Sequence, residues 1–492
     1  MSGIAGVITK NKNNDKNKVQ RMLDKISHRG TKAGNLINVD GNILGIISHY
    51  DIDHNCPILL DGRIYNIDSL LSKYGLKANG KETDVEKLGI LLNEIGPDIV
   101  KELKGPFAFM GFDKDKNFYL ARDLIGRKPL YYYLDKNSDR IIFASEIKSL
   151  LQLTDKAVEF PPGHIMKNFG KPKEISQIQK EGFEILEDSE TEDVVRKLED
   201  YMLKAVEKRI NENSDLGVWL SGGVDSSIIA ALVKEFKEEV HTFSVGFENS
   251  PDLISSRKVA KALGTKHKEH LLDLDELFDA IPEVIYHLES FDAPLVRSSL
   301  GNMIAAKLSS KADIVFSGEG GDEVFAGYNY FFDFDSANTI QEELVKAINS
   351  LHNTALQRVD RLANAHSVTV RLPMLDENLI NFAMTIPTSK KIKRNENISK
   401  YVLRRVAEKY LPDDIAWRAK EKFWEGSGIQ DTLTEKIEEN ISDSEFSQNR
   451  KLENGFVLRN KEEMYYYKIF RKFFPNVNID HILSFTGDFE QE

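Results

Sequence analysis

The sequence predicts a two-domain protein of mixed α/β and α+β class, in which an antiparallel β-sandwich precedes a doubly wound parallel α/β domain. Its 492 residues exceed what one hydrophobic core usually supports, so two or three domains are expected. The first third contains short apolar segments of strand character, and the second half alternates apolar strands with helical segments. The first pattern is typical of antiparallel sandwiches, and the second is typical of parallel doubly wound sheets.

The strands of the first third are expected in six segments. Their sequences are GIAGVIT, NILGIIS, GPFAFMGFD, NFYLARD, PLYYYLD and RIIFASE. Turn-forming residues separate them, for example at 113–117 and 135–139, and a helix is expected at 84–94. The first strand begins almost at the first residue, although chain termini usually fray unless they are tied down. Some contact must therefore hold Ser2 in place.

The composition changes between residues 161 and 190, where a turn-rich segment is followed by an acidic one. We expect the linker at about residues 175–192. A helix at 194–210 follows, and then the strand LGVWL, the loop SGGVDSS, the helix IIAALVKEF and the strands VHTFSVGF and ADIVFSG with a helix between them. In a parallel sheet of this kind, ligands bind beyond the carboxyl ends of the strands.

Composition excludes several classes of function. The chain has 66 Lys and Arg residues against 78 Asp and Glu residues, a formal charge of -12, which disfavours a nucleic-acid partner. Neither a membrane-spanning apolar run nor a secretory signal is present, so we expect no membrane partner and a cytoplasmic location. Cys56 is the single cysteine, which excludes an intramolecular disulfide and cysteine-based zinc or iron–sulfur sites.

The strongest motif is LSGGVDSS, residues 220–227, between an apolar strand and an apolar helix. Gly222 and Gly223 allow a sharp turn and a close approach to a ligand. The N–H groups that begin the helix, together with the hydroxyls of Ser221 and Ser226, suit a phosphate group. Asp225 would repel phosphate unless Mg²⁺ lies between them, and no Walker A lysine follows. The loop therefore predicts a metal-bound pyrophosphate site; the alternative is a capped strand-to-helix turn.

Two further loops follow strands of the same predicted sheet. Val245 and Gly246 end one strand and are candidates for an adenine slot. The segment SGEGGDE, residues 317–323, combines three glycines with three carboxylates at the end of another strand. Acids crowded in this way repel each other unless a cation lies among them, so Mg²⁺ or a substrate amine is expected there. The alternative is a solvated acidic turn.

With these loops, the motifs HRG (28–30), DGRIYN (61–66), ARDLIGRKPLYY (121–132), FASEIKSL (143–150), RLPMLD (371–376) and WRAKEKF (417–423) extend over nearly the full length. The chain resembles the glutamine-dependent asparagine synthetases. The resemblance implies an N-terminal Ntn-hydrolase αββα sandwich at 2–185, which is a type-2 glutamine amidotransferase domain. It also implies an ATP-pyrophosphatase domain at 191–492 with a helical C-terminal part.

The resemblance implies that ATP adenylates a carboxylate, that pyrophosphate leaves, and that an amine attacks the acyl-adenylate. Glu319 would help form the adenylate and deprotonate the amine, and Lys420 would neutralise charge on the α-phosphate. The metal ligands would be Asp225 and Asp322. The implied nucleotide-binding residues are Leu220, Ser221, Gly222, Gly223, Asp225, Ser226, Val245, Ser317 and Gly318.

The N-terminal domain departs from the family where glutamine hydrolysis takes place. The family nucleophile is a cysteine that follows the initiator methionine, but Ser2 occupies that position and is a much weaker nucleophile. The oxyanion-hole asparagine is replaced by Asp61, the acid that recognises the glutamine amine is replaced by Arg63, and GIISHYD lacks the arginine that grips the glutamine carboxylate. Of these pocket positions only Asp84 keeps its type. The sequence therefore predicts an inactive glutaminase.

Free ammonia is then the expected nitrogen donor, and aspartate is the expected acceptor acid, with Arg297 as a candidate partner for its carboxylate. Two threonines typical of the aspartate pocket are missing, and Trp424 alters the family pattern. Three alternatives remain: a β-lactam-synthetase-like enzyme, a tRNA-modifying ATP pyrophosphatase and a non-catalytic regulatory protein. The retained Glu319 disfavours the first. The resemblance also suggests a homodimer with small-molecule substrates.

Overall fold

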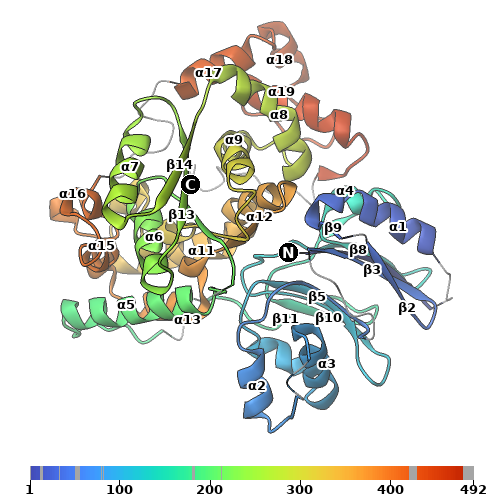
Figure 1. Cartoon of the computed structure of the whole chain (residues 1–492). Helices are drawn as coiled ribbons and strands as arrows, with labels where there is room; N and C mark the ends of the chain where they lie inside the picture. The colour runs from blue at the N-terminus through green and yellow to red at the C-terminus, as the bar shows by residue number, and fades with distance from the viewer. Residues whose placement is uncertain are drawn as a thin grey trace.

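The computed structural model describes residues 2–10, 15–32, 34–49, 56–78, 80, 82–179, 183–211, 213–419 and 429–479, with side chains from 432 in the last segment. The antiparallel sheets of the N-terminal part and the parallel sheet of the C-terminal part lie side by side (Figure 1). Among the described residues, two sheets belong to the first part and one to the second. The predicted combination of α+β and α/β architecture is therefore confirmed.

The N-terminal domain is built on two facing antiparallel sheets. In the first sheet the order is β2 (Asn35–Val39), β3 (Asn42–Ser48), β1 (Ser2–Thr9), β8 (Arg140–Ala144), β7 (Tyr131–Asp135) and β9 (Val158–Glu159). In the second the order is β11 (Lys173–Glu174), β10 (His164–Lys167), β6 (Phe118–Arg122), β5 (Phe107–Phe112) and β4 (Ile58–Gly62). Strand β1 pairs with β3 and β8 on its two edges, and these ladders hold the N-terminus in place.

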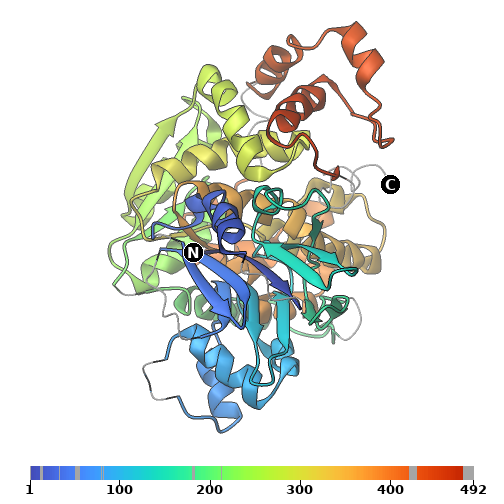
Figure 2. The ribbon, with the colours of Figure 1, turned by 90° about the vertical axis from the view of Figure 1, so that its right-hand side faces the viewer.

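Helices cover the outer faces of both sheets, which gives the expected αββα layers (Figures 1 and 2). The first sheet packs against α1 (Lys16–Asp24) and α4 (Ile147–Leu150), and the second packs against α2 (Ile67–Lys73) and α3 (Asp84–Glu94). Thr83 and Glu86 form a capping box that fixes the start of α3, and therefore the position of Asp84 in its first turn. The 3₁₀ turns of this domain are η1 (Ser27–Arg29) and η2 (Pro97–Glu102).

The C-terminal domain contains one parallel sheet. Its order is β14 (Lys266–Leu271), β13 (His241–Gly246), β12 (Leu216–Trp219), β15 (Ile314–Phe316) and β16 (Thr369–Arg371). The chain leaves β12 toward β13 on one side and later returns to β15 on the other, so β12 marks the topological switch point. The predicted doubly wound sheet is confirmed, and its ligand site is expected at the carboxyl end of β12.

Helices surround this sheet and form the helical C-terminal part (Figures 1 and 2). Those that follow the first strands are α6 (Val224–Phe236), α7 (Pro251–Leu263), α8 (Leu274–Leu288) and α9 (Ala293–Leu308). The other helices are α5 (Thr191–Glu207), α10 (Gly321–Phe325), α11 (Ala337–Ser350), α12 (Ala355–Ala365), α13 (Glu377–Thr385), α14 (Thr388–Lys391), α15 (Tyr401–Ala407), α16 (Asp413–Ala416), α17 (Ile429–Glu438), α18 (Asp443–Asn449) and α19 (Lys461–Phe473). The 3₁₀ turns are η3 (Asn329–Phe332), η4 (Leu351–Asn353), η5 (Pro373–Leu375) and η6 (Arg394–Glu396).

Two helix boundaries differ from the sequence expectation. Helix α5 begins at Thr191 instead of 194, because Glu192 and Asp193 favour the N-terminal turn of a helix. Helix α6 begins at Val224 instead of 228, so the second half of SGGVDSS is helical. The phosphate-binding loop expected there is therefore only three residues long, and Asp225 and Ser226 belong to the first turn of α6.

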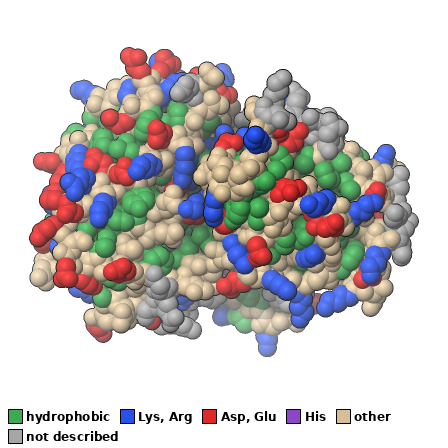
Figure 3. All heavy atoms as spheres, turned by 90° about the horizontal axis from the view of Figure 1, so that it is seen from below, with side chains coloured by type: hydrophobic (Ala, Val, Ile, Leu, Met, Phe, Trp, Pro, Cys, Tyr) green, Lys and Arg blue, Asp and Glu red, His purple; other side chains and the backbone are tan. Residues whose placement is uncertain are grey.

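On the face shown in Figure 3, basic and acidic side chains are interspersed with scattered apolar ones. This face therefore presents no continuous basic surface of the kind that binds nucleic acid. Within the described ranges, each helix is either too short or too polar to traverse a lipid bilayer. The structure thus gives no support to a membrane-spanning helix in that part of the chain.

Candidate active site

A pocket of about 330 Å³ lies at the carboxyl ends of β12, β13 and β15. It forms at the predicted switch point of the parallel sheet. The sequence-predicted residues that line it are Leu220, Ser221, Asp225, Ser226, Val245, Ser317, Gly318, Glu319 and Asp322. Parallel strands place their carboxyl ends at one edge, and this is why three loops that are far apart in sequence meet here.

The loop after β12 turns at Gly222, whose φ is 76°. A Cβ at Gly222 would lie 2.6 Å from the backbone nitrogen of Ser256, so only glycine fits. Gly223 is the N-cap of α6 and no side chain caps that helix, so N–H groups of its first turn face the loop without a capping acceptor. Ser226 Oγ lies 3.0 Å from Ser221 Oγ and accepts a hydrogen bond from the Ser221 N–H at 3.2 Å. This arrangement of donors suits a phosphate group.

The loop after β15 packs directly on this turn. A Cβ at Gly318 would lie 2.6 Å from the backbone nitrogen of Ser226, and a Cβ at Gly321 would lie 2.6 Å from the Asp225 carboxylate. The backbone N–H of Ser317 donates to the carbonyl oxygen of Arg371 at 3.0 Å, which ties the loop to β16. The glycines of SGEGGDE therefore allow two loops to touch through their backbones.

Two basic residues that the sequence analysis missed hold the acids of the pocket. Arg358 on α12 donates to Glu319 Oε1 at 2.9 Å, and Arg358 also lines the pocket. Lys400 precedes α15 in a left-handed conformation, and its Nζ contacts Asp225 and lies 2.8 Å from Asp322 Oδ1. The one sequence signal was that crowded acids require a cation. The sequence did not reveal that a lysine 175 positions from Asp225 supplies it.

A further acid of this loop, Glu323, is buried beside the pocket. Burial, and then the neighbouring carboxylates of Asp322 and Glu319, raise the pKa of Glu323 to about 7. Its carboxyl group accepts a hydrogen bond from Tyr328 Oη at 2.5 Å. The acids of SGEGGDE thus occupy different environments, since Glu319 and Asp322 face the cavity and Glu323 packs into the protein.

The predicted Mg²⁺ ligands Asp225 and Asp322 converge on a common cation, the Lys400 ammonium. In the described part of the chain, no three His, Cys, Asp or Glu side chains gather as a metal site. Magnesium ions commonly bind through one or two carboxylates together with substrate phosphates. Two convergent carboxylates beside a phosphate-binding turn fit that mode and no all-protein cage.

Among the described residues, the predicted Gly222, Gly223 and Arg297 do not line this pocket. Lys420 lies outside the described residues, as does Trp424. The chain leading to Lys420 is anchored at the site, because Arg418 Nη1 donates to the carbonyl oxygen of Gly222 at 3.2 Å. Arg297 lies on α9, but its guanidinium forms two bonds to Glu462 of α19, at 2.6 and 3.1 Å. The structure therefore pairs Arg297 with another side chain.

Ser2, the nucleophile position of the N-terminal domain, is buried at the start of β1. Its Oγ donates to the carbonyl oxygen of Leu60 at 3.0 Å and lies 3.3 Å from Asp61 Oδ1. The carbonyl oxygen of Ser2 accepts a bond from Arg29 Nε at 3.0 Å. The strand pairing and these contacts explain how β1 is held in place from Ser2 onward.

Asp61 belongs to a buried ion network between the two domains. Arg29 contacts Asp61 at 3.0 Å, and it contacts Glu146 and Asp360 at 2.8 Å each. Burial alone would lower the pKa of Arg29, but the three carboxylates outweigh burial and raise that pKa well above its ordinary value. Lys128 lies 2.8 Å from Asp360 and 3.7 Å from Asp61. The structure therefore balances the charge of Asp61 with Arg29 and Lys128.

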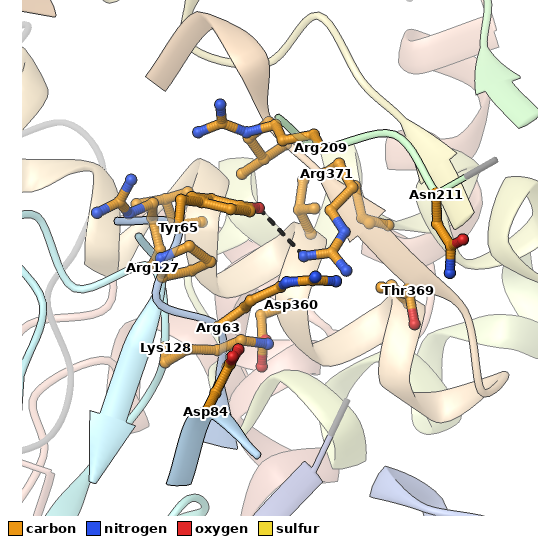
Figure 4. Close-up of a pocket in the computed structure, with 17 residues that line it drawn as sticks. Arg63, Tyr65, Asp84, Arg127, Lys128, Arg209, Asn211, Asp360, Thr369 and Arg371 are labelled. Carbon is orange, nitrogen blue, oxygen red and sulfur yellow. Dashed lines mark hydrogen bonds and ion pairs between the residues drawn. The ribbon is translucent and has the colours of Figure 1, made fainter. Parts of the chain in front are cut away.

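Arg63 and Asp84, the other altered and retained glutamine positions, line a second pocket of about 310 Å³ (Figure 4). His49 is the one basic residue of GIISHYD, the segment in which the family resemblance places the carboxylate-binding arginine. Burial, and then the nearby positive charges, lower the pKa of His49 to about 4. A neutral imidazole at physiological pH cannot replace the charge of an arginine. The structure therefore brings Arg63 and Asp84 together, while Ser2 and Asp61 lie in the buried network.

Comparison with known proteins identifies both domains. The glutamine amidotransferase domain model matches residues 1–180, and the asparagine synthase model matches residues 197–340 and 333–481. A probable glutamine-hydrolysing asparagine synthetase of Schizosaccharomyces pombe is 33% identical over 471 residues, which covers 88% of this chain and 84% of that protein. Asparagine synthetase B of Escherichia coli is 33% identical, with 85% and 79% covered. An Oryza sativa glutamine-hydrolysing asparagine synthetase is 35% identical, with 87% and 75% covered.

The fold and these matches define a ligase that uses ATP to form C–N bonds and that carries a glutamine amidotransferase domain. The chain belongs to the asparagine synthetase family. The family expectation drawn from the sequence motifs is therefore confirmed. The acceptor acid, the nitrogen donor and the roles of individual residues remain predictions.

Proposed function

We propose that the C-terminal domain activates aspartate with ATP and transfers the acyl group to ammonia, and that the N-terminal domain no longer hydrolyses glutamine. An aspartate carboxylate oxygen bonds to the α-phosphorus, and the bond from that phosphorus to the pyrophosphate oxygen breaks. Ammonia then attacks the acyl carbon and AMP leaves. The observation that carries this proposal is the pocket in which the loops after β12, β13 and β15 meet around Glu319.

In this proposal the turn at Gly222 and the first turn of α6 bind the phosphates through backbone N–H groups and serine hydroxyls. Asp225 and Asp322 would hold Mg²⁺, which supplies positive charge to the phosphates. Lys400 adds a fixed positive charge between the same two carboxylates, and Lys420 is predicted to neutralise the α-phosphate. Leu220 and Val245 are the apolar residues predicted to contact adenosine.

Glu319 is proposed to receive the proton that ammonia loses as it attacks. Its carboxylate faces the pocket and is 20% exposed, and Arg358 orients it through one hydrogen bond at 2.9 Å. One carboxylate oxygen is thus held in place while the residue stays accessible from the cavity. A positioned proton acceptor of this kind contributes about 10²–10⁴-fold to rate.

The loss of glutaminase activity is argued from three residues, Ser2, Asp61 and Arg63. Ser2 Oγ donates a hydrogen bond to the carbonyl oxygen of Leu60 and lies beside Asp61. A hydroxyl is also a far weaker nucleophile than a thiolate. Asp61 is a carboxylate bound by Arg29, so it offers no N–H to an oxyanion. Arg63 puts positive charge where the amine of glutamine would lie.

Assays of pyrophosphate, AMP and amide test the proposal. With ATP, Mg²⁺ and aspartate, we expect product with ammonium and none with glutamine. A more specific test uses the variant Ser2→Cys, which restores a thiol at the nucleophile position but leaves Asp61 and Arg63 unchanged. We expect this variant to release no glutamate from glutamine, with Ser2→Ala as the matched control. Glutamine-dependent synthesis by Ser2→Cys would show that the pocket is intact and that only the nucleophile is missing.

A second candidate is an amide ligase of the same mechanism that acts on a different acid. The pairing of Arg297 with Glu462 favours it, because this arginine is already occupied by a carboxylate of the protein. A panel of carboxylic acids in the pyrophosphate assay separates the two candidates: release with aspartate alone supports the first. The domain limits 2–185 and 191–492, the homodimer and the cytoplasmic location stay predictions.

A further inference from the structure

The pocket of about 310 Å³ lies between the two domains and is lined by both (Figure 4). The N-terminal domain contributes Gly62 and Arg63 at the end of β4, Tyr65, and Asp84 at the start of α3. The C-terminal domain contributes residues of α12 and of β16. The volume is at the lower end of the range for small-molecule sites, so it suits a small metabolite.

Five basic residues and two acids line this pocket. Three of the basic residues have carboxylate partners. Arg127 is bound to Asp123 at 3.0 Å and also contacts Glu377. The other two pairs are Arg209 with Asp376 and Lys128 with Asp360, each at 2.8 Å. The charges of these three residues are therefore balanced inside the protein.

Within the described ranges, neither Arg63 nor Arg371 forms an ion pair with a carboxylate. The Arg63 side chain makes no hydrogen bond or ion pair to the described residues, and it is exposed at the pocket. Among the residues that the structure describes, the Arg371 side chain donates only to Tyr65 Oη, at 3.1 Å, and its Nε is buried without a hydrogen-bond partner. Asp84 is the one remaining acid, which leaves an excess of positive charge facing the cavity.

The pKa of the Tyr65 phenol reflects the positive electrostatic potential in this pocket. Burial alone would raise its pKa, yet Arg371 and Arg209 together bring the pKa of Tyr65 below its ordinary value. For Asp84 the balance is the other way: burial is the larger effect and raises its pKa, while Arg63 and Lys87 act to lower it. The positive potential therefore acts on more than one neighbouring group.

We propose that this interdomain pocket is a binding site for a small anion, a metabolite that presents a carboxylate or phosphate group to Arg63 and Arg371. Guanidinium groups bind both of these groups through paired, charge-assisted hydrogen bonds. The inference goes beyond the proposed function, because it assigns a ligand to a pocket that neither the adenylation nor the ammonia step uses.

The pocket shares two elements with the synthetase site. On α12, Arg358 lines the synthetase pocket, while the next two residues, Val359 and Asp360, line the anion pocket. On β16, the Arg371 side chain faces the anion pocket, while its carbonyl oxygen accepts the Ser317 N–H of the nucleotide loop. An anion bound here would therefore contact elements that also shape the ATP site.

Calorimetric titration of the full chain tests the proposal, with Mg²⁺ and a non-hydrolysable ATP analogue present to saturate the synthetase pocket. The probes are inorganic phosphate and succinate, and their relative affinities distinguish a phosphate from a carboxylate ligand. We expect at least one to bind, and we expect Arg63→Ala to raise its Kd at least about tenfold. The matched control is Arg196→Ala, which removes an exposed arginine from α5 and should leave Kd unchanged.

Arg63 is exposed, so its replacement should leave the fold intact, and a thermal unfolding curve checks this. Binding of neither probe would overturn the proposal, as would equal affinity in wild type and Arg63→Ala. Ammonia-dependent pyrophosphate release on the same preparations reports the proposed function separately. The anion site can therefore fail while synthesis is retained, or the reverse.

Discussion

The two sites use buried charge in opposite ways. In the synthetase pocket Glu319 and Asp322 are 20% and 23% exposed, and their basic partners hold them at the wall of a cavity. In the N-terminal domain Arg29 and Asp61 are 0% exposed, and their bonds are made entirely inside the protein. A group that must meet a substrate keeps a face open to it. At Asp61, where the family resemblance implies an oxyanion-hole residue, the structure shows a buried ion pair.

The largest expected effect is on catalysis at Glu319. Glu319→Gln keeps the shape of the side chain but removes the proton acceptor, so amide formation should fall about 10²–10⁴-fold. Steady-state amide production measures it, and Glu207→Gln on the exposed face of α5 is the matched control. A wild-type rate in Glu319→Gln would remove the basis for treating the two sites as different in function.

Arg29→Met tests whether the buried ion network of the N-terminal domain stabilises the fold. The substitution leaves Asp61, Glu146 and Asp360 without one shared partner, and breaking a buried ion network in this way costs about 3–5 kcal/mol of unfolding free energy. Urea denaturation should show this loss for Arg29→Met and almost none for Arg196→Met, whose side chain is 75% exposed. Equal stability of both variants would mean that the network is dispensable.

The buried carboxyl group of Glu323 should make the stability of the protein depend on pH. Its folded-state pKa of about 7 lies above the ordinary 4.5, so the folded chain keeps a proton that the unfolded chain has already released. This contribution to stability is full below about pH 4.5 and is lost as the pH rises through 7, by about 3 kcal/mol in total.

Denaturation curves at several pH values should therefore show a smaller fall in stability for Glu323→Gln than for wild type between pH 5 and 8. The comparison of the two proteins removes the effect of the other titrating groups. Parallel curves for both would contradict the assignment of a buried, proton-holding Glu323.

The smallest expected effect concerns the contact between the two nucleotide loops. Gly318→Ala places a Cβ 2.6 Å from the backbone of Asp225 and Ser226, so the loops must separate slightly. The KM for ATP should rise about tenfold, a shift of about 1.4 kcal/mol, with little change in melting temperature. Gly89→Ala in α3, where the nearest atom would be 3.5 Å away, is the control and should leave KM unchanged.

Much of the synthetase site could be predicted from sequence, because parallel strands align their carboxyl ends. SGGVDSS and SGEGGDE each follow a buried strand, so their meeting at one edge follows from the strand pattern alone. The departures of the N-terminal domain from the family pattern were also visible, since each is a change of residue type at a motif position. The partners of these residues were not visible. Lys400, Arg358 and Glu462 lie in segments without a recognisable motif.

The sequence by itself determined the antiparallel sandwich, the parallel α/β domain and the glycine-rich loops after its strands, because periodicity and glycine-rich turns are local properties. It also determined which motif positions differ from the family pattern. Only the tertiary structure decided which charges neutralise one another. Asp360 lies 331 positions from Arg29, and no local pattern encodes that contact. Burial makes such pairs strong and the loss of one partner costly. The packing of the two domains therefore decides that Glu319 faces a cavity while Asp61 is held in a buried ion network.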